Sequence, residues 1–237
     1  MTAVHVVAFL AVFLAGWNQF FIFRLKRGKD PSARLRTYWL VMASLWVVTA
    51  AAVGVVGLRT LWYAHLSSSE KQWLPGSPVI AAMVIISLGF MLAPMVIARK
   101  PAGLAALSRQ IENLRFVLPQ SAGERIWWVA ISVTAGVCEE ILYRSFLFYY
   151  LHIAPWRLGF AVAISLACLI FGLGHVYQGL KGVLATGLLG FLFFVLFLGT
   201  GSLLLPIVLH ALADLRVLLL MRVAQAGAVN SPANVGG

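Results

Sequence analysis

Acidic, basic and imidazole side chains interrupt three otherwise apolar stretches in the C-terminal half of the chain. They are Glu139, Glu140 and Arg144 in the first stretch, His175 in the second, and His210 and Asp214 in the third. Carboxylates and imidazoles transfer protons in general acid and base catalysis. Ionisable groups are costly inside a membrane and usually mark function there. We therefore expect the chemistry of this protein in these three stretches.

Helical spacing predicts how the charged side chains meet. Residues four apart share a helix face, so Glu140 and Arg144 are expected to form a buried ion pair. His210 and Asp214 are also four apart, which places an imidazole and a carboxyl on one face. Glu139 points about 100° away from Glu140 and has no basic partner on its own turn. A poorly solvated carboxylate without a counterion suits proton abstraction, so Glu139 is the candidate general base.

Each feature also has a purely structural interpretation. A buried ion pair between Glu140 and Arg144 can simply hold helices together, and His175 alone is more often a core residue than a catalyst. Straight helices would also leave His175 on the order of 10 Å in depth from the other groups. A tilt or kink at Gly172 and Gly174, or shifted helix limits, would remove this gap. The convergence of six such groups on three apolar stretches nevertheless favours a site.

The elements that must position these groups are predicted to be membrane helices. The chain of 237 residues is 62% apolar and 11% charged, against roughly 45–50% and 25% in soluble domains. This composition excludes a soluble globule and a disordered chain, and two cysteines within apolar stretches exclude a disulfide-stapled scaffold. A membrane helix needs about 20 apolar residues. We expect about seven (six to eight), near Val4–Phe23, Tyr38–Leu58, Val79–Ala98, Ile126–Leu151, Leu158–Val176, Gly182–Gly199 and Leu203–Met221.

The basic residues orient this all-α bundle. The net charge of +11 is concentrated in loops on one side of the bundle, rather than in a patch for nucleic acid. The positive-inside rule then predicts an exterior N-terminus and a cytoplasmic C-terminus in the cytoplasmic (inner) membrane. The first stretch lacks the features of a removable signal peptide, so it is expected to be a permanent anchor. The loop Lys100–Glu124 is amphipathic and predicts a helix on the inner membrane face.

Three regions follow from this pattern. Residues 1–125 hold the N-terminal membrane helices and the amphipathic loop. Residues 126–223 hold the ionisable groups and form the expected catalytic core. Residues 224–237, rich in small and polar residues, are expected to be a flexible tail.

The ordered motifs resemble a known family. Glu139-Glu140-x-x-x-Arg144, Phe171-x-x-x-His175 and His210-x-x-x-Asp214 are similar to the motifs of the CAAX protease and bacteriocin-processing family (CPBP, also called Abi). These proteins are intramembrane glutamic endopeptidases and include the Ras-converting-enzyme CAAX proteases. The resemblance covers roughly Trp127 to Leu220, and the first three stretches contribute nothing to it.

The resemblance implies a role for each residue. Glu139 with His175 would activate a water for attack on a peptide carbonyl, and His210 with Asp214 would stabilise the oxyanion. Glu140 and Arg144 would hold the site in shape. The family often has Asn where this chain has Asp214, and an ionised Asp cannot donate a hydrogen bond. We therefore expect Asp214 to orient His210 as an acceptor.

Metal dependence is open at this stage. The family was long considered metal-dependent, and Glu139, His175 and His210 form a ligand set that suits zinc. However, the chain has no His-Glu-x-x-His helix, and Arg144 opposes a divalent cation. A glutamic protease without a cofactor is favoured over a zinc metalloprotease.

The expected partners are membrane lipid and a protein or peptide substrate, with no nucleic acid. The client is expected to be membrane-associated or to carry a C-terminal or leader tag. Two other functions remain as alternatives. Buried acidic and basic groups also build proton- or ion-coupled transporters, although paired halves are not visible here. A non-catalytic relative serving as an immunity factor or scaffold is the other alternative.

Overall fold

The structure, a computed structural model, describes residues 2–28, 32–72 and 74–229, and it contains helices and no named strand within these ranges. The α-helices are α1 (Ala3–Arg27), α2 (Ala33–Val56), α3 (Leu58–Trp62), α4 (Ser68–Lys71), α5 (Ser77–Ile97), α6 (Pro101–Leu114), α7 (Ala122–Glu139), α8 (Phe160–Leu173), α9 (Gly179–Thr200) and α10 (Leu204–Val229). Two π-helices, η1 (Glu140–Phe146) and η2 (Tyr149–Ile153), continue from α7, and the 3₁₀-helix η3 (Val176–Gln178) precedes α9.

Within the described ranges, six helices are long and apolar enough to cross a membrane. They correspond to six of the seven predicted stretches, and the segment Ala122–Ile153 combines α7, η1 and η2. The predicted all-α bundle is confirmed, and the protein is a multi-pass membrane protein. The fifth predicted stretch is shorter than expected, because α8 has only 14 residues. The amphipathic stretch forms α6, as predicted.

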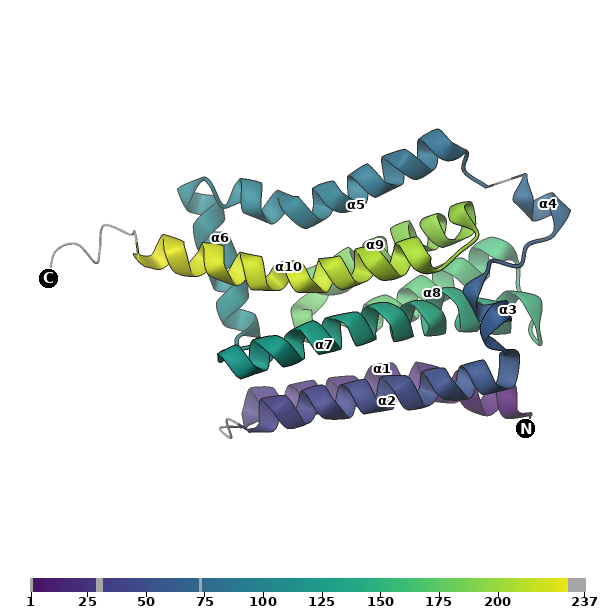
Figure 1. Ribbon diagram of the computed structural model, residues 1–237, viewed down its shortest axis with the longest axis horizontal. Coiled ribbons are helices and arrows are strands. Elements are labelled where there is room, and N and C mark those ends of the chain that lie inside the picture. The colour runs from purple at the N-terminus through teal and green to yellow at the C-terminus, as the bar shows by residue number, and fades with distance from the viewer. Residues whose placement is uncertain (1, 29–31, 73, 230–237) are drawn as a thin grey trace, which may run out of the picture.

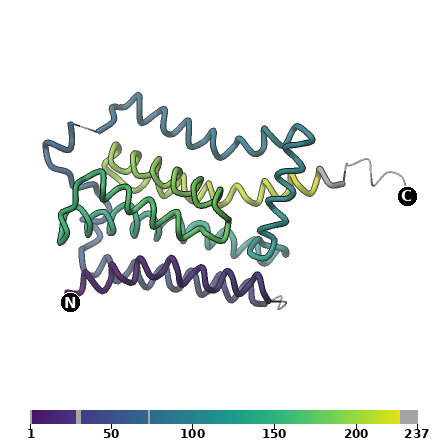
Figure 2. Tube along the Cα trace, turned by 180° about the vertical axis from the view of Figure 1, so that it is seen from behind, coloured from purple at the N-terminus to yellow at the C-terminus, as the bar shows by residue number. Residues whose placement is uncertain are grey.

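The long helices lie side by side along the longest axis of the molecule (Figure 1). α1 and α2 form one flank, α5 forms the opposite flank, and α7, α8, α9 and α10 lie between them. α6 runs across one end of the bundle, as Figure 2 shows from behind. The functional motifs are therefore in the central helices, between two flanking layers.

The basic residues gather at the end of the bundle where α6 lies. We call this the basic end, and it includes the C-terminal ends of α1 and α10 and the beginnings of α2 and α7 (Figure 1). The opposite end carries α3 and α4. α1 begins and α10 ends at opposite ends of the bundle (Figure 1). α10 continues to Val229, so residues 224–229 of the expected tail are helical, and residues 230–237 lie outside the described ranges.

The start of α7 is fixed by polar contacts at the basic end. Ser121 caps the helix, since its hydroxyl accepts from Glu124 N–H and its own N–H donates to the Glu124 carboxylate. Such a reciprocal cap satisfies two backbone donors that the helix leaves free. Arg34 of α2 then pairs with Glu124 at 3.0 Å. These contacts fix the position of the helix that carries the first motif.

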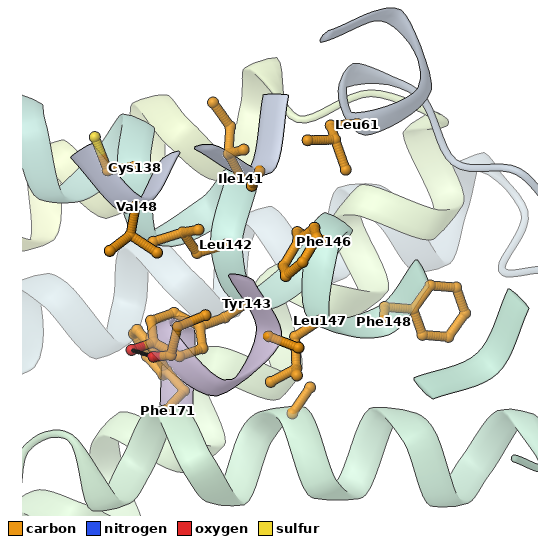
Figure 3. Packing of buried hydrophobic residues seen from close by; sticks show 14 of the residues in the cluster. Val48, Leu61, Cys138, Ile141, Leu142, Tyr143, Phe146, Leu147, Phe148 and Phe171 are labelled. Carbon is orange, nitrogen blue, oxygen red and sulfur yellow. Dashed lines mark hydrogen bonds between the residues drawn. The ribbon is translucent and has the colours of Figure 1, made fainter. Parts of the chain in front are cut away.

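The main apolar core surrounds η1 (Figure 3). Leu142 and Phe146 of η1 and the following residue Leu147 are almost fully buried in it. Tyr143 lies beside Phe171 of α8, with ring centroids 5.4 Å apart. A π-helix is rare and often occurs at functional sites, and here it carries Glu140 and Arg144.

Candidate active site

Glu140 and Arg144 form the buried ion pair that their spacing predicted. Arg144 Nε lies 3.1 Å from Glu140 Oε2, and the two side chains are 1% and 0% exposed. The Arg144 guanidinium also lies over the Phe171 ring, 3.8 Å from its centroid. A buried cation is stabilised by a carboxylate and by an aromatic face. Glu140 is thus held by a partner that is itself fixed.

Glu140 has a second partner on α10 that the sequence did not predict. His210 Nδ1 donates to Glu140 Oε1 over 2.6 Å, and His210 is 5% exposed. A hydrogen bond to a carboxylate is among the stronger kinds in proteins. Glu140 therefore joins the first and third motifs directly. The expectation that Asp214 orients His210 differs from this geometry, in which Glu140 accepts the hydrogen bond of the imidazole.

The other imidazole nitrogen faces two further carboxylates. His210 Nε2 lies 3.8 Å from Glu139 Oε2 and 3.9 Å from Asp214 Oδ2. Both distances exceed the range of a direct hydrogen bond. The side chains of Glu139 and Asp214 are 16% and 39% exposed, whereas that of Glu140 is fully buried. Glu139 and Asp214 are therefore the accessible carboxylates of the cluster.

His175 lies beyond the end of α8 rather than within a straight helix. α8 ends at Leu173, and His175 is in the short turn before η3. The histidine ring lies 5.0 Å from the Phe171 ring, which is in turn 5.8 Å from the His210 ring. The early end of α8 thus places His175 in a turn, beside the same aromatic ring that contacts His210. His175 Nδ1 donates to Phe171 O over 3.0 Å, which leaves Nε2 as the acceptor of a neutral ring.

Gln19 of α1 holds the turn that carries His175, and the sequence reasoning missed it. Its side-chain amide donates to Gly174 O, and its carbonyl accepts from Tyr177 N–H over 3.2 Å. Gln19 is only 7% exposed. A buried amide that satisfies the backbone on both sides of a turn fixes that turn. The sequence could have indicated Gln19, because it is an amide residue within an otherwise apolar predicted membrane helix.

Two glycines allow the close contacts that this arrangement needs. A Cβ atom on Gly136 would lie 3.0 Å from Ile207 O and 3.1 Å from Ala211 N, so α7 and α10 meet one turn before Glu139. A Cβ atom on Gly190 of α9 would lie 2.9 Å from the Phe171 ring. Larger residues would separate these helices, because packed interiors have little free space.

The structure brings together most of the predicted site residues. Glu139, Glu140, Arg144, His210 and Asp214 form one cluster, and His175 lies beside the Phe171 ring that also contacts His210. Among the described residues, no group of three or more His, Cys, Asp or Glu side chains is arranged to hold a metal ion. The alternative zinc set of Glu139, His175 and His210 is therefore not gathered as a ligand group.

The cluster of acidic, basic and imidazole groups lies inside an apolar helical bundle. Residues 121–216 match the model of the family described as Rce1-like, type II CAAX prenyl endopeptidase. This segment is therefore similar to the CAAX protease family that the motifs resemble. The match includes the whole cluster and supports a CAAX-type intramembrane endopeptidase as the general class. The search of curated proteins and the search of solved structures returned no match.

Proposed function

We propose that this protein hydrolyses a peptide bond of a membrane-associated client with a water activated by Glu139. The observation that carries the proposal is the unequal environment of the two neighbouring carboxylates. Glu140 is fully buried and bound to Arg144 and His210. Glu139 is partly exposed and faces His210 across 3.8 Å. The Glu140 carboxylate is thus held in a structural ion pair, whereas the Glu139 carboxylate is accessible to water.

Glu139 and His175 share the activation of water in this proposal. A water bound to Glu139 gives a proton to the carboxylate as its oxygen attacks the peptide carbonyl carbon. The free Nε2 of His175 accepts a hydrogen bond from the same water. Collapse of the tetrahedral intermediate breaks the C–N bond, and Glu139 returns the proton to the leaving amine. General base catalysis of this kind contributes roughly 10²–10⁴-fold to a rate.

His210 is the proposed oxyanion donor. Its Nδ1 donates to Glu140, so the ring is held with Nε2 towards Glu139 and Asp214. A protonated ring in this orientation donates from Nε2 to the developing oxyanion, and preorganised donors are most effective in a dry site. Asp214 Oδ2 lies 3.9 Å from Nε2, and this carboxyl is proposed to support the orientation of the ring. The carboxylates and Arg144 are proposed to act without a metal cofactor.

The test uses purified protein and fluorogenic peptides that end in Cys-aliphatic-aliphatic-X, with the cysteine prenylated or free. Glu139→Gln is expected to lower kcat by roughly 10²–10⁴-fold, because an amide cannot accept the proton. The matched control is Glu112→Gln, since Glu112 lies on α6 with a 70% exposed side chain. Cleavage by Glu139→Gln at the wild-type rate would refute the proposed base.

Two further measurements separate the alternatives. Activity that survives exhaustive chelation supports the metal-free mechanism, and activity that returns only with added zinc contradicts it. Proton uptake into vesicles that depends on Glu139, without any peptide cleavage, would support a transporter instead. The prenylated and free peptides also show whether the client must be lipidated.

A further inference from the structure

A groove lies between α7 and α10 at the basic end, away from the catalytic cluster. It has a volume of about 210 Å³. Arg125 of α7 and Arg222 of α10 line its two sides, and Gln225 adds an amide. None of the lining residues that the structure describes is acidic. The polar part of the groove is therefore suited to an anion.

The rest of the groove is apolar and open to the surface. Ile126 and Val129 of α7 line it with Leu218 of α10. Ile126 is 71% exposed and Val129 is 43% exposed, although both belong to a candidate membrane span. Exposed apolar side chains in a membrane span are covered by acyl chains. The groove thus offers two guanidinium groups directly beside a surface that accepts hydrocarbon.

We propose that this groove binds an anionic phospholipid of the surrounding bilayer. The phosphodiester would lie between Arg125 and Arg222, and an acyl chain would follow Ile126 and Val129 along α7. Basic pockets between membrane helices bind anionic lipid headgroups for this reason, and guanidinium groups match phosphate oxygens in geometry. The proposal does not depend on the peptidase activity.

The place of the groove gives the lipid a structural effect. Arg222 lies two turns beyond Asp214, about 12 Å along α10, and Arg125 lies about 21 Å from Glu139 along α7. The headgroup would therefore join the two helices that carry the cluster, at the end opposite to the close contact of Gly136 with Ile207. Without the anion, the two arginines repel each other across the groove. Anionic lipid is thus expected to stabilise the pairing of α7 with α10.

The test compares full-length protein in nanodiscs of phosphatidylcholine alone with nanodiscs that contain phosphatidylglycerol. The wild-type melting temperature is expected to rise with phosphatidylglycerol, and native mass spectrometry should detect retained lipid. Arg125→Gln with Arg222→Gln should weaken retention by roughly 30-fold, since each basic group near an anionic surface contributes about fivefold. The control is Arg109→Gln, an exposed basic residue of α6 outside the groove, and it should retain lipid as the wild type does.

Three outcomes would overturn the proposal. One is a wild-type melting temperature that does not respond to phosphatidylglycerol. Another is an equal loss of lipid from the Arg109→Gln control, which would indicate general attraction to the basic end. The third is an equal stabilisation of detergent-solubilised protein by inorganic phosphate, which would assign the groove to a soluble anion.

Discussion

Glu139 and Glu140 are adjacent in the chain, yet they have different surroundings, and we expect different roles for the two carboxylates. Glu140 is the first residue of η1, and Arg144 follows four residues later. The α7–α10 contact then brings His210 to the other Glu140 oxygen. A fully buried carboxylate between two fixed partners cannot move freely to bind substrate or water. Its contribution is therefore expected mainly in the stability of the cluster.

Glu140→Gln is expected to destabilise the fold, whereas Glu139→Gln is expected to leave it stable. The first substitution removes the charge that compensates buried Arg144, and breaking a buried pair costs about 3–5 kcal/mol. Thermal melting of the purified variants measures the difference. The Glu112→Gln variant, with an exposed side chain, controls for the loss of any carboxylate. Equal melting temperatures for the Glu139 and Glu140 variants would contradict this division of roles.

The turn between α8 and α9 shows how an element without a motif supports the site. Gln19 of α1 bonds Gly174 O and Tyr177 N–H, on both sides of His175. The other hydrogen bonds of the described turn are local, such as that from His175 N–H to Gly172 O, whereas Gln19 ties it to a different helix. The N-terminal helices thus position a candidate catalytic histidine.

Gln19→Leu is expected to lower kcat by at least about tenfold with little change in KM. The substitution leaves Gly174 O and Tyr177 N–H without their buried partner, at a cost of about 1–3 kcal/mol each, so thermal melting is used to check that the variant is folded. A shifted pH profile of kcat would report a changed environment of His175. A purely structural defect would lower kcat without shifting the profile. The control is Asn18→Leu, because the neighbouring Asn18 side chain contacts Ser44 instead of the turn. An unchanged kcat in Gln19→Leu would exclude the positioning role.

The spacing of residues in the sequence predicted side-chain contacts within one helix. It did not predict contacts that depend on how different helices pack. The Glu140–Arg144 pair follows from a separation of four residues and is confirmed. The Glu140–His210 hydrogen bond joins residues 70 apart, and it depends on the depth and rotation of α7 against α10. The Gln19 contacts span more than 150 residues and depend on packing in the same way. The length of α8 was overestimated because the chain leaves the α-helix after Leu173 and forms a turn at Gly174 and His175.

The short helix α4 lies outside the membrane spans and is tied to η2 by a titratable group. Glu70 Oε1 lies 2.5 Å from His152 Nε2, and Ser67 donates to the same carboxyl from its hydroxyl and its N–H. Partial burial alone would raise the pKa of Glu70. The hydrogen bonds from Ser67 and the contact with His152 outweigh it, so the pKa lies below its usual value.

This lowered pKa predicts an acid-dependent loss of stability. A carboxyl with a lower pKa in the folded state stabilises the protein above its unfolded pKa, and the effect disappears as the pH falls through the folded pKa. Glu70→Gln should therefore melt below the wild type at roughly pH 5–6 and should equal it at pH values well below 4.5, the ordinary value. Melting curves of both proteins across this range measure the gap. A gap that widens in acid would contradict the assignment.

The whole molecule is electrostatically polarised along the helix axes. The basic end carries Arg34, Arg109, Arg125 and Arg222, whereas the end with α3 and α4 has few basic residues, among them Arg59. Basic loops are retained on the cytoplasmic side of a membrane. The same asymmetry predicts that the proposed lipid groove faces the leaflet that is rich in anionic headgroups.

The polarity predicts the topology of the protein in cells. In a background of Cys138→Ala and Cys168→Ala, which removes both native thiols, single cysteines are introduced as Arg59→Cys and Arg109→Cys. Both positions are exposed, and they lie at opposite ends of the bundle. A membrane-impermeant maleimide should label the first variant in intact cells and the second only after permeabilisation, because the basic end is retained inside. The reverse pattern would show that the basic end lies outside the cell. The groove between Arg125 and Arg222 would then face away from the anionic leaflet.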